Sequence, residues 1–334
     1  MSITPVRIVS IGRAVPDTVI TNEDLTKILD TSDEWITTRT GIKQRHIASG
    51  NENSLTLGIS AAKDALKKAN LEGKDIDLII AATSNPHNIY PSTACLISEA
   101  IETQRDIPAF DITAACTGML YAMELGRALI SSGKYNRILL VATDTVSKFV
   151  DWTDRGSCVL FGDGSSSMIL EKSPDSVDDI IALEIHADGK QGKHIQMHLN
   201  GTNCPLVEPQ EPENERVMMN GKEVYKFVVT TMPEAVNSCI ENCGLKPEDI
   251  DYLIPHQANL RIIAALQERL NYADEKVITN IHKYGNTSAA SVGIALSEAI
   301  EEGKVKLPST AILCAFGAGM AWGSAIVRLR EGIY

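Results

Sequence analysis

The second half of the chain repeats the first, and this duplication limits the possible folds more than any other feature of the sequence. AAKDALKKANLEGKDIDLII, at residues 61–80, matches AVNSCIENCGLKPEDIDYLI, at residues 235–254. Ala, Leu and the triplet Asp-Ile-Asp recur in step when position 61 is aligned with position 235. Self-similarity of this kind is typical of a chain that contains two copies of one structural unit.

Two further matches follow in the same order. The predicted helix that ends in SSGK at 131–134 matches the one that ends in EEGK at 301–304. FGDGSSSMIL at 161–170 matches FGAGMAWGSAIV, which begins at Phe316. Three matches in one order indicate a duplication rather than chance similarity.

Strands and helices alternate along the chain. The predicted segments at its start are a strand at 6–11, an amphipathic helix at 55–70 and a strand at 76–83. The last of these, IDLIIAAT, is almost continuously apolar, as in a sheet that is covered on both faces. The alternation continues through Val141 and predicts an α/β sandwich. With the repeat, it predicts two related halves, 1–172 and 173–334.

Two helix starts are expected before residue 40. Thr21 is the predicted cap of a short helix at 22–29. In TSDEWITTRTGI, Thr31 and Glu34 have the spacing of a capping box just before Trp35. We therefore expect Thr31 to begin the second helix.

Cys116 lies between a predicted strand at 107–113 and a predicted helix at 117–132 that is apolar or small on nearly every face. Such a helix is expected inside the protein. Its positive end lowers the pKa of a neighbouring thiol. The residues that leave room around the sulfur are Ala114, Ala115 and Gly118. The pattern predicts a nucleophilic cysteine, and a small apolar core residue is the alternative.

The repeat connects Cys116 to a second region, because the offset that aligns SSGK with EEGK also aligns it with Asn286. If a pseudo-twofold axis relates the halves, two equivalent buried helices can lie side by side and share one site at their starts. Asn286 stands in a Gly-bearing turn before a small-residue helix, as a helix cap or as an inward-facing donor. His256 follows an apolar strand, with a helix beginning near Ala258. The end of a strand is the usual place for chemistry in α/β folds, although a lone His there is more often structural.

Composition excludes several classes of protein. The net charge is −12 with scattered Lys and Arg, which argues against a broad nucleic-acid interface. The seven cysteines include no CxxC pair, so we expect neither a disulfide framework nor a zinc site, and a reducing, cytoplasmic location. The start has no signal or transit pattern. The apolar run 311–327 carries three glycines and predicts two strands rather than a membrane span.

Three smaller patterns are assigned structural roles. His194 and His198 have metal-ligand spacing, but they stand in a polar, Gly-rich stretch that predicts a surface loop, and no metal is expected. Cys239 and Cys243 are expected in the core. Gly162-Asp163-Gly164 lacks the following helix of a dinucleotide site and predicts a strand turn.

Six motifs in this order resemble those of 3-oxoacyl-[acyl-carrier-protein] synthase III, a condensing-enzyme family of the thiolase superfamily. They are TSDEWITTRTGI, DITAACTGM, DRGSCVLFGDG, PHQANLRI, YGNTSAAS and AFGAGMAWGSA. The resemblance covers essentially the whole chain. It implies a thiolase-like five-layered αβαβα sandwich of two pseudo-symmetric halves. It also places Cys116, His256 and Asn286 on the catalytic triad of the family.

The implied activity is an acyltransferase reaction that initiates type II fatty acid biosynthesis. Cys116 would attack the thioester of a short acyl-CoA primer, acetyl-CoA being the expected one, and release CoA. His256 and Asn286 would stabilise the enolate formed when malonyl-acyl carrier protein loses carbon dioxide. The product is a 3-oxoacyl carrier protein. The backbone N–H groups of Cys116 and Ala318, a position where many relatives have Gly, would form the oxyanion hole, and no metal or redox cofactor is implied.

The same resemblance implies the binding residues. Trp35 and Arg155 match the pair that holds the CoA adenine between them. The other implied CoA-binding residues are Arg39, Thr40 and Asn259. The basic patch for the acidic carrier protein would include Lys226 and Arg261, for which solvated helix charges are the alternative. A buried tryptophan and surface arginines are the alternative for the adenine site.

The acyl pocket implied by the resemblance contains Tyr90, Phe161 and Phe316. Tyr90 replaces a Phe that many relatives contribute across a homodimer interface, and we expect poor use of primers longer than about four carbons. Thiolases and hydroxymethylglutaryl-CoA-type synthases are alternatives with the same fold and nucleophile, but they have other residues where this chain has GNTS. A secondary-metabolite condensing enzyme would keep the same triad. A non-catalytic partner subunit would be expected to lose part of it.

Overall fold

The computed structural model describes residues 4–198, 206 and 215–332. Residues 199–200, the end of the polar stretch that contains His194 and His198, lie outside this part of the chain, and so does Cys204. The helices and strands of the first half are β1 (Val6–Ala14), β2 (Val19–Thr21), α1 (Asn22–Leu25), α2 (Asp33–Thr40), β3 (Gln44–His46), α3 (Ser54–Ala69), β4 (Leu78–Ala82), α4 (Thr93–Ala100), β5 (Ala109–Ile112), α5 (Gly118–Ser131), β6 (Arg137–Asp144) and β7 (Gly164–Lys172).

The second half contains a similar succession. Its helices and strands are β8 (Ile180–Ala187), β9 (Ile195–Gln196), β10 (Met218–Met219), α6 (Gly221–Asn242), β11 (Tyr252–Pro255), α7 (Leu260–Leu270), α8 (Ile281–Tyr284), α9 (Ser291–Glu301), β12 (Ser309–Gly317) and β13 (Ala321–Leu329). Short 3₁₀ turns at Ala115–Thr117 (η2), Ser288–Ala290 (η7) and Ala318–Met320 (η8) lie beside the site described below.

The two large sheets have the same strand order. The first runs β1-β7-β6-β4-β5 and the second runs β8-β13-β12-β11, with β4 parallel to β6 as β11 is to β12. Beyond β11, a parallel bridge from Leu253 to Val277 stands where β5 pairs with β4 in the first sheet. This shared order supports our proposal of two related halves, 1–172 and 173–334.

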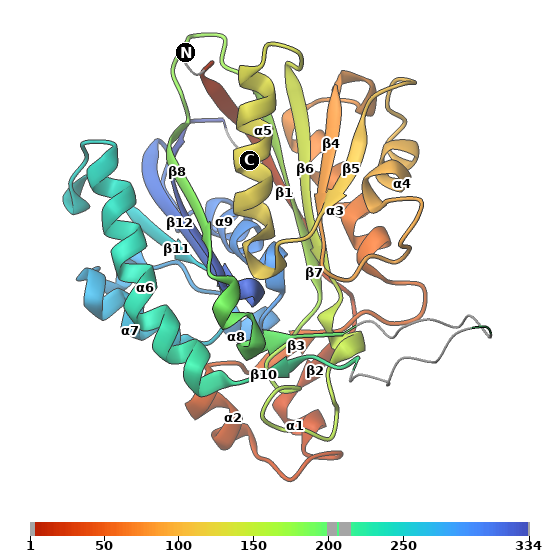
Figure 1. Ribbon diagram of the computed structural model, residues 1–334, viewed down its shortest axis with the longest axis vertical. Coiled ribbons are helices and arrows are strands. Elements are labelled where there is room, and N and C mark those ends of the chain that lie inside the picture. Colours follow the sequence, from red (N-terminus) through yellow and green to blue (C-terminus); the bar gives the residue numbers. More distant parts are fainter. Residues whose placement is uncertain (1–3, 199–205, 207–214, 333–334) are drawn as a thin grey trace.

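The helices and the two large sheets stack in layers (Figure 1). Helices α5 and α9 lie between the sheets, and their buried residues form one core with strands of both sheets. Helices α3 and α4 cover the outer face of the first sheet, and α6 and α7 cover that of the second. Strand β4 is fully buried, as its apolar run predicts. The result is a five-layered αβαβα sandwich.

The structure corrects one feature of the repeat. Gly118, the first residue of α5, corresponds to Ser291, the first residue of α9, because η2 and η7 precede these helices in the same way. Helix α5 has 14 residues and α9 has only 11, so an alignment made at the ends of the two helices does not hold at their starts. Alignment of Cys116 with Asn286 is therefore wrong. The structural counterpart of Cys116 is Ala289, which has the same place in its 3₁₀ turn.

Two predicted helix starts differ in outcome. Thr21 caps α1 and forms a capping box with Asp24, as expected, although the helix ends at Leu25. Thr31 does not cap α2. Ser32 does so instead, because its extended backbone lets the side-chain oxygen accept the Trp35 N–H at 3.0 Å.

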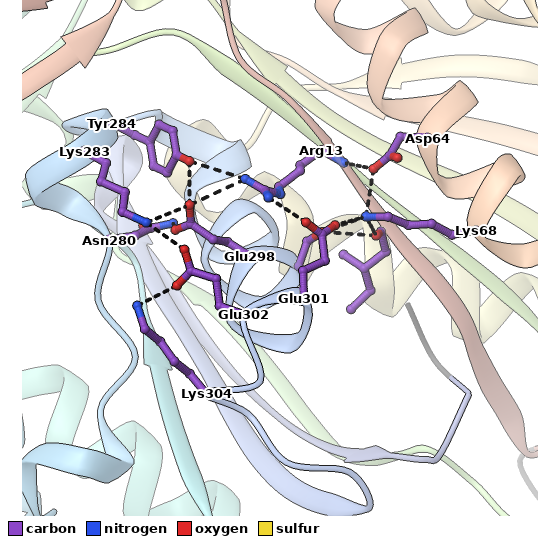
Figure 2. Close-up of polar contacts among 12 residues, drawn as sticks. Arg13, Asp64, Lys68, Asn280, Lys283, Tyr284, Glu298, Glu301, Glu302 and Lys304 are labelled. Atoms are coloured by element: carbon purple, nitrogen blue, oxygen red, sulfur yellow. Dashed lines mark hydrogen bonds and ion pairs between the residues drawn. The ribbon is translucent and has the colours of Figure 1, made fainter.

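A polar network joins the two halves outside the site (Figure 2). Glu298 of α9 is 5% exposed and accepts hydrogen bonds from Tyr284 at 2.6 Å and Asn280 at 3.0 Å. Glu301, one turn later, binds Arg13 of β1 at 2.6 Å and also pairs with Lys68 of α3. These contacts attach α9 to the first sheet and its outer helix.

Four findings on the described residues concern patterns discussed above. No helix among them is both long enough and apolar enough to cross a membrane. They also contain no group of three or more His, Cys, Asp or Glu side chains that could hold a metal ion. Cys239 is buried in the core as predicted, and Cys243 packs against the same cluster. Gly162–Gly164 leads into β7 without a helix, as predicted for a strand turn.

Candidate active site

One cavity of about 600 Å³ brings together most of the residues that the sequence predicts for the site. It lies at the starts of α5 and α9 and extends to α2 and α7. The predicted residues that line it are Trp35, Arg39, Thr40, Cys116, Phe161, His256, Asn259, Arg261, Asn286, Phe316 and Ala318. Tyr90, Arg155 and Lys226 are not part of its lining.

Cys116 stands in η2, between β5 and α5. The preceding Ala115 has φ +44°, a left-handed conformation that is unfavourable for a residue with a side chain and is characteristic of functional turns. Gly317, at the end of β12, packs directly against this turn, and a Cβ there would lie 2.8 Å from the Cys116 nitrogen. Since Ala318 follows Gly317, the backbone of both predicted oxyanion-hole residues borders the same part of the cavity.

The expected lowering of the Cys116 pKa is wrong. Burial raises the pKa of the thiol to about 12 and outweighs the opposing effect of a hydrogen bond to Ser288. The nearby carboxylate of Asp144 raises it further. The Sγ–Oγ distance to Ser288 is 3.4 Å. The free thiol is therefore protonated at neutral pH and must lose its proton when it attacks.

His256 directly follows β11, in the predicted place after a strand end. Its backbone N–H donates to the Cys314 carbonyl at 2.7 Å, and its ring packs edge-on against Phe316 with centroids 5.3 Å apart. The side chain is 2% exposed, and burial lowers its pKa to about 3. The imidazole is therefore neutral. Its Nδ1 lies 2.6 Å from the Ser291 hydroxyl, and no partner for Nε2 is found within the described part of the chain.

Asn286 has one of the two roles that the sequence left open, that of a cap, and its role as a donor stays a prediction. Its Oδ1 accepts the Ser288 N–H at 2.9 Å, which caps the turn before α9. Among the described residues, no partner is found for its Nδ2, and the residue lines the cavity. Its backbone is fixed on both sides, because its N–H donates to Leu160 at 2.8 Å and its carbonyl accepts from Gly162 at 3.0 Å.

The predicted nucleotide residues gather around Trp35. The guanidinium of Arg39 lies 4.4 Å from the Trp35 ring centroid and that of Arg155 lies 5.1 Å from it. Arg155 also donates to the Asp30 carbonyl at 2.6 Å. Trp35 and Arg155 thus contact each other directly, with no adenine-sized space between them. Thr40 is buried and donates to the Ile36 carbonyl of its own helix.

Asn259 lines the cavity and caps α7, where its Oδ1 accepts the Arg261 N–H at 2.9 Å. That helix begins at Leu260, two residues later than expected. Arg261 and Lys226 are exposed on α7 and α6, and Arg261 also donates to the Thr38 carbonyl at 3.3 Å. Tyr90 is 85% exposed in this single chain, so its predicted role at a dimer interface stays a prediction.

Sequence reasoning missed several residues of the site. Ser288 and Ser291, which touch Cys116 and His256, lie within the quoted GNTSAAS motif but had no assigned role. The stretch predicted as a surface loop instead supplies cavity wall, because β9 and Met197 border the cavity. Met219 of β10, which pairs with Ile195, lies on the same wall. Strands of two residues give too weak a periodic signal to be predicted.

The fold and this constellation of a cysteine, a neutral histidine and an asparagine define a condensing enzyme of the thiolase type. The model of the family described as 3-oxoacyl-[acyl-carrier-protein (ACP)] synthase III matches residues 110–189, and the model of its C-terminal part matches residues 240–329. The chain belongs to this family.

Known relatives agree over nearly the full length. The beta-ketoacyl-[acyl-carrier-protein] synthase III of Aquifex aeolicus (strain VF5) is 45% identical over 323 residues, which are 96% of this chain and 99% of the relative. The crystal structure of 3-oxoacyl-[acyl-carrier-protein] synthase III from Aquifex aeolicus VF5 has a TM-score of 0.88, with 97% of this chain and 100% of that chain covered. The priming beta-ketosynthase from the R1128 polyketide biosynthetic pathway has a TM-score of 0.90 at 30% identity, with coverages of 98% and 97%.

These matches confirm the predicted family, the thiolase-like fold and the enzyme class. The chain is an acyltransferase of the beta-ketoacyl synthase III type, whose reaction condenses an acyl-CoA with malonyl-acyl carrier protein at the start of fatty acid biosynthesis.

Proposed function

We propose that Cys116, His256 and Asn286 carry out this condensation with acetyl-CoA as the primer. The observation that carries the proposal is that all three line one cavity, together with the Trp35 and Arg39 pair expected to meet CoA. The reaction has two stages, and different groups act in each.

In the first stage, the Cys116 sulfur attacks the acetyl thioester and displaces CoA, which leaves an acetyl-enzyme. The backbone N–H groups of Cys116 and Ala318 stabilise the tetrahedral oxyanion. Removing one such donor typically lowers the rate by about 10²- to 10³-fold. The adenine of CoA binds against the Trp35 ring, and Arg155 moves away from its direct contact with that ring to admit it. Thr40 and Asn259 complete the CoA site.

In the second stage, malonyl-acyl carrier protein replaces CoA. Nε2 of His256 and Nδ2 of Asn286 donate to the malonyl thioester oxygen and stabilise the enolate as carbon dioxide leaves. A neutral imidazole suits this role, because it can donate while adding no charge to the buried site. The carbanion then attacks the acetyl group on Cys116. No step of this reaction requires a metal or a redox cofactor.

The remaining assignments concern partners and location. Lys226 and Arg261 meet the acidic carrier protein, and two chains form a homodimer in which Tyr90 of each closes the acyl pocket of the other. Phe161 and Phe316 form the rest of that pocket. The cytoplasm is the location that suits an enzyme with free cysteines and these substrates.

The test is product formation from acetyl-CoA and malonyl-acyl carrier protein, with intact-mass detection of acetyl-Cys116 and Cys116→Ala as the control. Condensation with an adduct that the variant lacks would support the proposal. An adduct without condensation would point to an acyltransferase of the same fold. Equal turnover of octanoyl-CoA and acetyl-CoA would contradict the short acyl pocket.

A further inference from the structure

The mechanism above leaves a buried carboxylate beside the nucleophile without a role. Asp144, the last residue of β6, is 0% exposed. Its Oδ1 accepts the Ser84 N–H at 2.8 Å and the Thr83 hydroxyl at 3.3 Å, and its Oδ2 accepts the Ala289 N–H at 3.3 Å. Burial raises its pKa to about 6, against the lowering effect of hydrogen bonds that include one from the Ser288 hydroxyl.

Ser288 connects this carboxylate to the reacting sulfur. Its hydroxyl lies 3.4 Å from the Cys116 Sγ, and the N–H of the next residue, Ala289, donates to Asp144 at 3.3 Å, so Ser288 adjoins both groups. A hydrogen bond from the Ser288 hydroxyl is also among the effects that lower the Asp144 pKa. The backbone holds the hydroxyl in place, because Ser288 is 4% exposed and its N–H donates to Asn286. Its φ of +50° is a left-handed conformation that a serine adopts only when the surroundings enforce it.

The acylation step needs such a connection. The Cys116 thiol is protonated at neutral pH, and burial keeps the His256 imidazole a very weak base. Ser291 also occupies the Nδ1 of that ring. A carboxylate that is ionised near pH 7 and reaches the sulfur through one hydroxyl is a more suitable proton acceptor.

We propose that Ser288 and Asp144 form a proton relay for Cys116. As the sulfur bonds to the thioester carbon, its proton passes to the Ser288 oxygen while the Ser288 proton passes to the Asp144 carboxylate. When the tetrahedral intermediate collapses, the bond from carbon to the CoA sulfur breaks, and the proton returns through Ser288 to the departing thiolate. The exchange of one thioester for another is balanced without a further reactant. This inference rests on the proposed acylation of Cys116.

The surroundings of Asp144 make its protonation state simple to interpret. From the end of β4, Thr83 and Ser84 face it, and from η7, Ser288 and Ala289 do. From η2, the titratable group whose pKa is affected by the Asp144 charge is Cys116. Asp163 precedes Gly164, the strand partner of Asp144, but binds Ala48 at 2.8 Å and Ser147 at 3.0 Å instead.

The test compares the variants Asp144→Asn and Ser288→Ala with two matched controls. Asp163→Asn changes another buried carboxylate whose pKa burial raises, and Ser165→Ala removes a buried hydroxyl that donates to the Ala142 carbonyl. The rate of acetyl-Cys116 formation is measured by quenched intact-mass analysis from pH 5.5 to 9. Alkylation of Cys116 by iodoacetamide over the same range gives a readout that needs no substrate.

In the wild type, both rates should rise through about pH 6 and then level off, following the Asp144 carboxylate. Both relay variants should acylate about 10²- to 10⁴-fold more slowly at pH 7, the usual contribution of general-base catalysis. Their rates should still be climbing at pH 9, because only the thiolate of a thiol with a pKa of about 12 then reacts. The two controls should keep the wild-type rate and profile.

A structural role for Ser288 would also disturb the second stage, so malonyl-acyl carrier protein decarboxylation is compared between Cys116→Ala and the double variant with Ser288→Ala. The relay predicts equal rates. Wild-type-like acylation profiles in the relay variants, or a parallel loss of decarboxylation, would overturn it. If Asp144→Asn does not fold, Ser288→Ala alone is enough to test the relay, since it keeps the hydrogen bonds that Asp144 accepts from the backbone N–H groups of Ser84 and Ala289. Iodoacetamide decides the question even if acetyl-CoA is not the primer.

Discussion

Replacing Ser291 by Ala should weaken decarboxylation without affecting acylation to a similar degree. The Ser291 hydroxyl lies 2.6 Å from Nδ1 of His256 and accepts the Gln257 N–H at 3.3 Å. A hydroxyl that accepts from Gln257 can donate its own proton to Nδ1. The ring proton is then fixed on Nε2, the nitrogen proposed to donate to the malonyl thioester.

The size of the effect follows from one hydrogen bond. Losing a net 0.5–1.5 kcal/mol, the usual range of about one such bond, shifts the balance between the two neutral tautomers by about two- to tenfold. Decarboxylation should fall by that factor, and acetylation of Cys116 by less than about twofold. Since Nδ1 and the Gln257 N–H are both buried, the free energy of unfolding should also fall by about 1–3 kcal/mol.

The assay is carbon dioxide release from malonyl-acyl carrier protein, beside intact-mass measurement of acetyl-Cys116. Ser297→Ala is the matched control, because Ser297 is equally buried on α9 but donates to Ile11, away from the site. It should lose stability and keep its decarboxylation rate. Nitrogen-15 shifts of labelled His256 report the tautomer directly. Full decarboxylation in Ser291→Ala with unchanged shifts would refute the reasoning.

Three other perturbations of the site, and one of the network in Figure 2, have defined outcomes. Gly317→Ala would place a Cβ 2.8 Å from the Cys116 nitrogen, so acetyl-enzyme formation should fall on the order of 10²-fold. A wild-type rate would show that the Cys116 turn can shift without loss of activity. Trp35→Ala should raise KM for acetyl-CoA about 2- to 30-fold with kcat unchanged. This factor corresponds to the free energy of one cation–π contact. A change in kcat alone would argue against a CoA site. His256→Gln should remove a pH dependence of stability. The pKa of His256 is about 3 in the fold and 6.5 is the ordinary value, so the unfolded chain binds the proton first and unfolding becomes easier as pH falls from 6.5 toward 3. An equal fall of the free energy of unfolding with pH in both proteins, measured by urea melts, would contradict this. Glu298→Ala should lower the free energy of unfolding by about 3 kcal/mol, since it leaves its partners in the inter-half network unpaired, and a change below about 0.5 kcal/mol would show that the network contributes little.

The sequence was sufficient for the architecture because the signals of the fold are local and repeated. The apolar run of β4 predicted a strand covered on both faces, and it is fully buried. The matches at 61–80 and 235–254 fall on α3 with β4 and on α6 with β11, elements with the same place in the two sheets. The quoted motifs were likewise enough to identify the family and to place Cys116 and His256 between the correct elements.

Tertiary structure decided what depends on distance and burial. The shorter α9 moved the counterpart of Cys116 from Asn286 to Ala289, which no constant offset can reveal. Helix position predicts a lowered thiol pKa, but burial raises it, because removing water disfavours the charged thiolate. Asp144 and Ser288 belong to different halves of the chain, and only the packing of β6 against η7 brings that carboxylate within one hydroxyl of the sulfur.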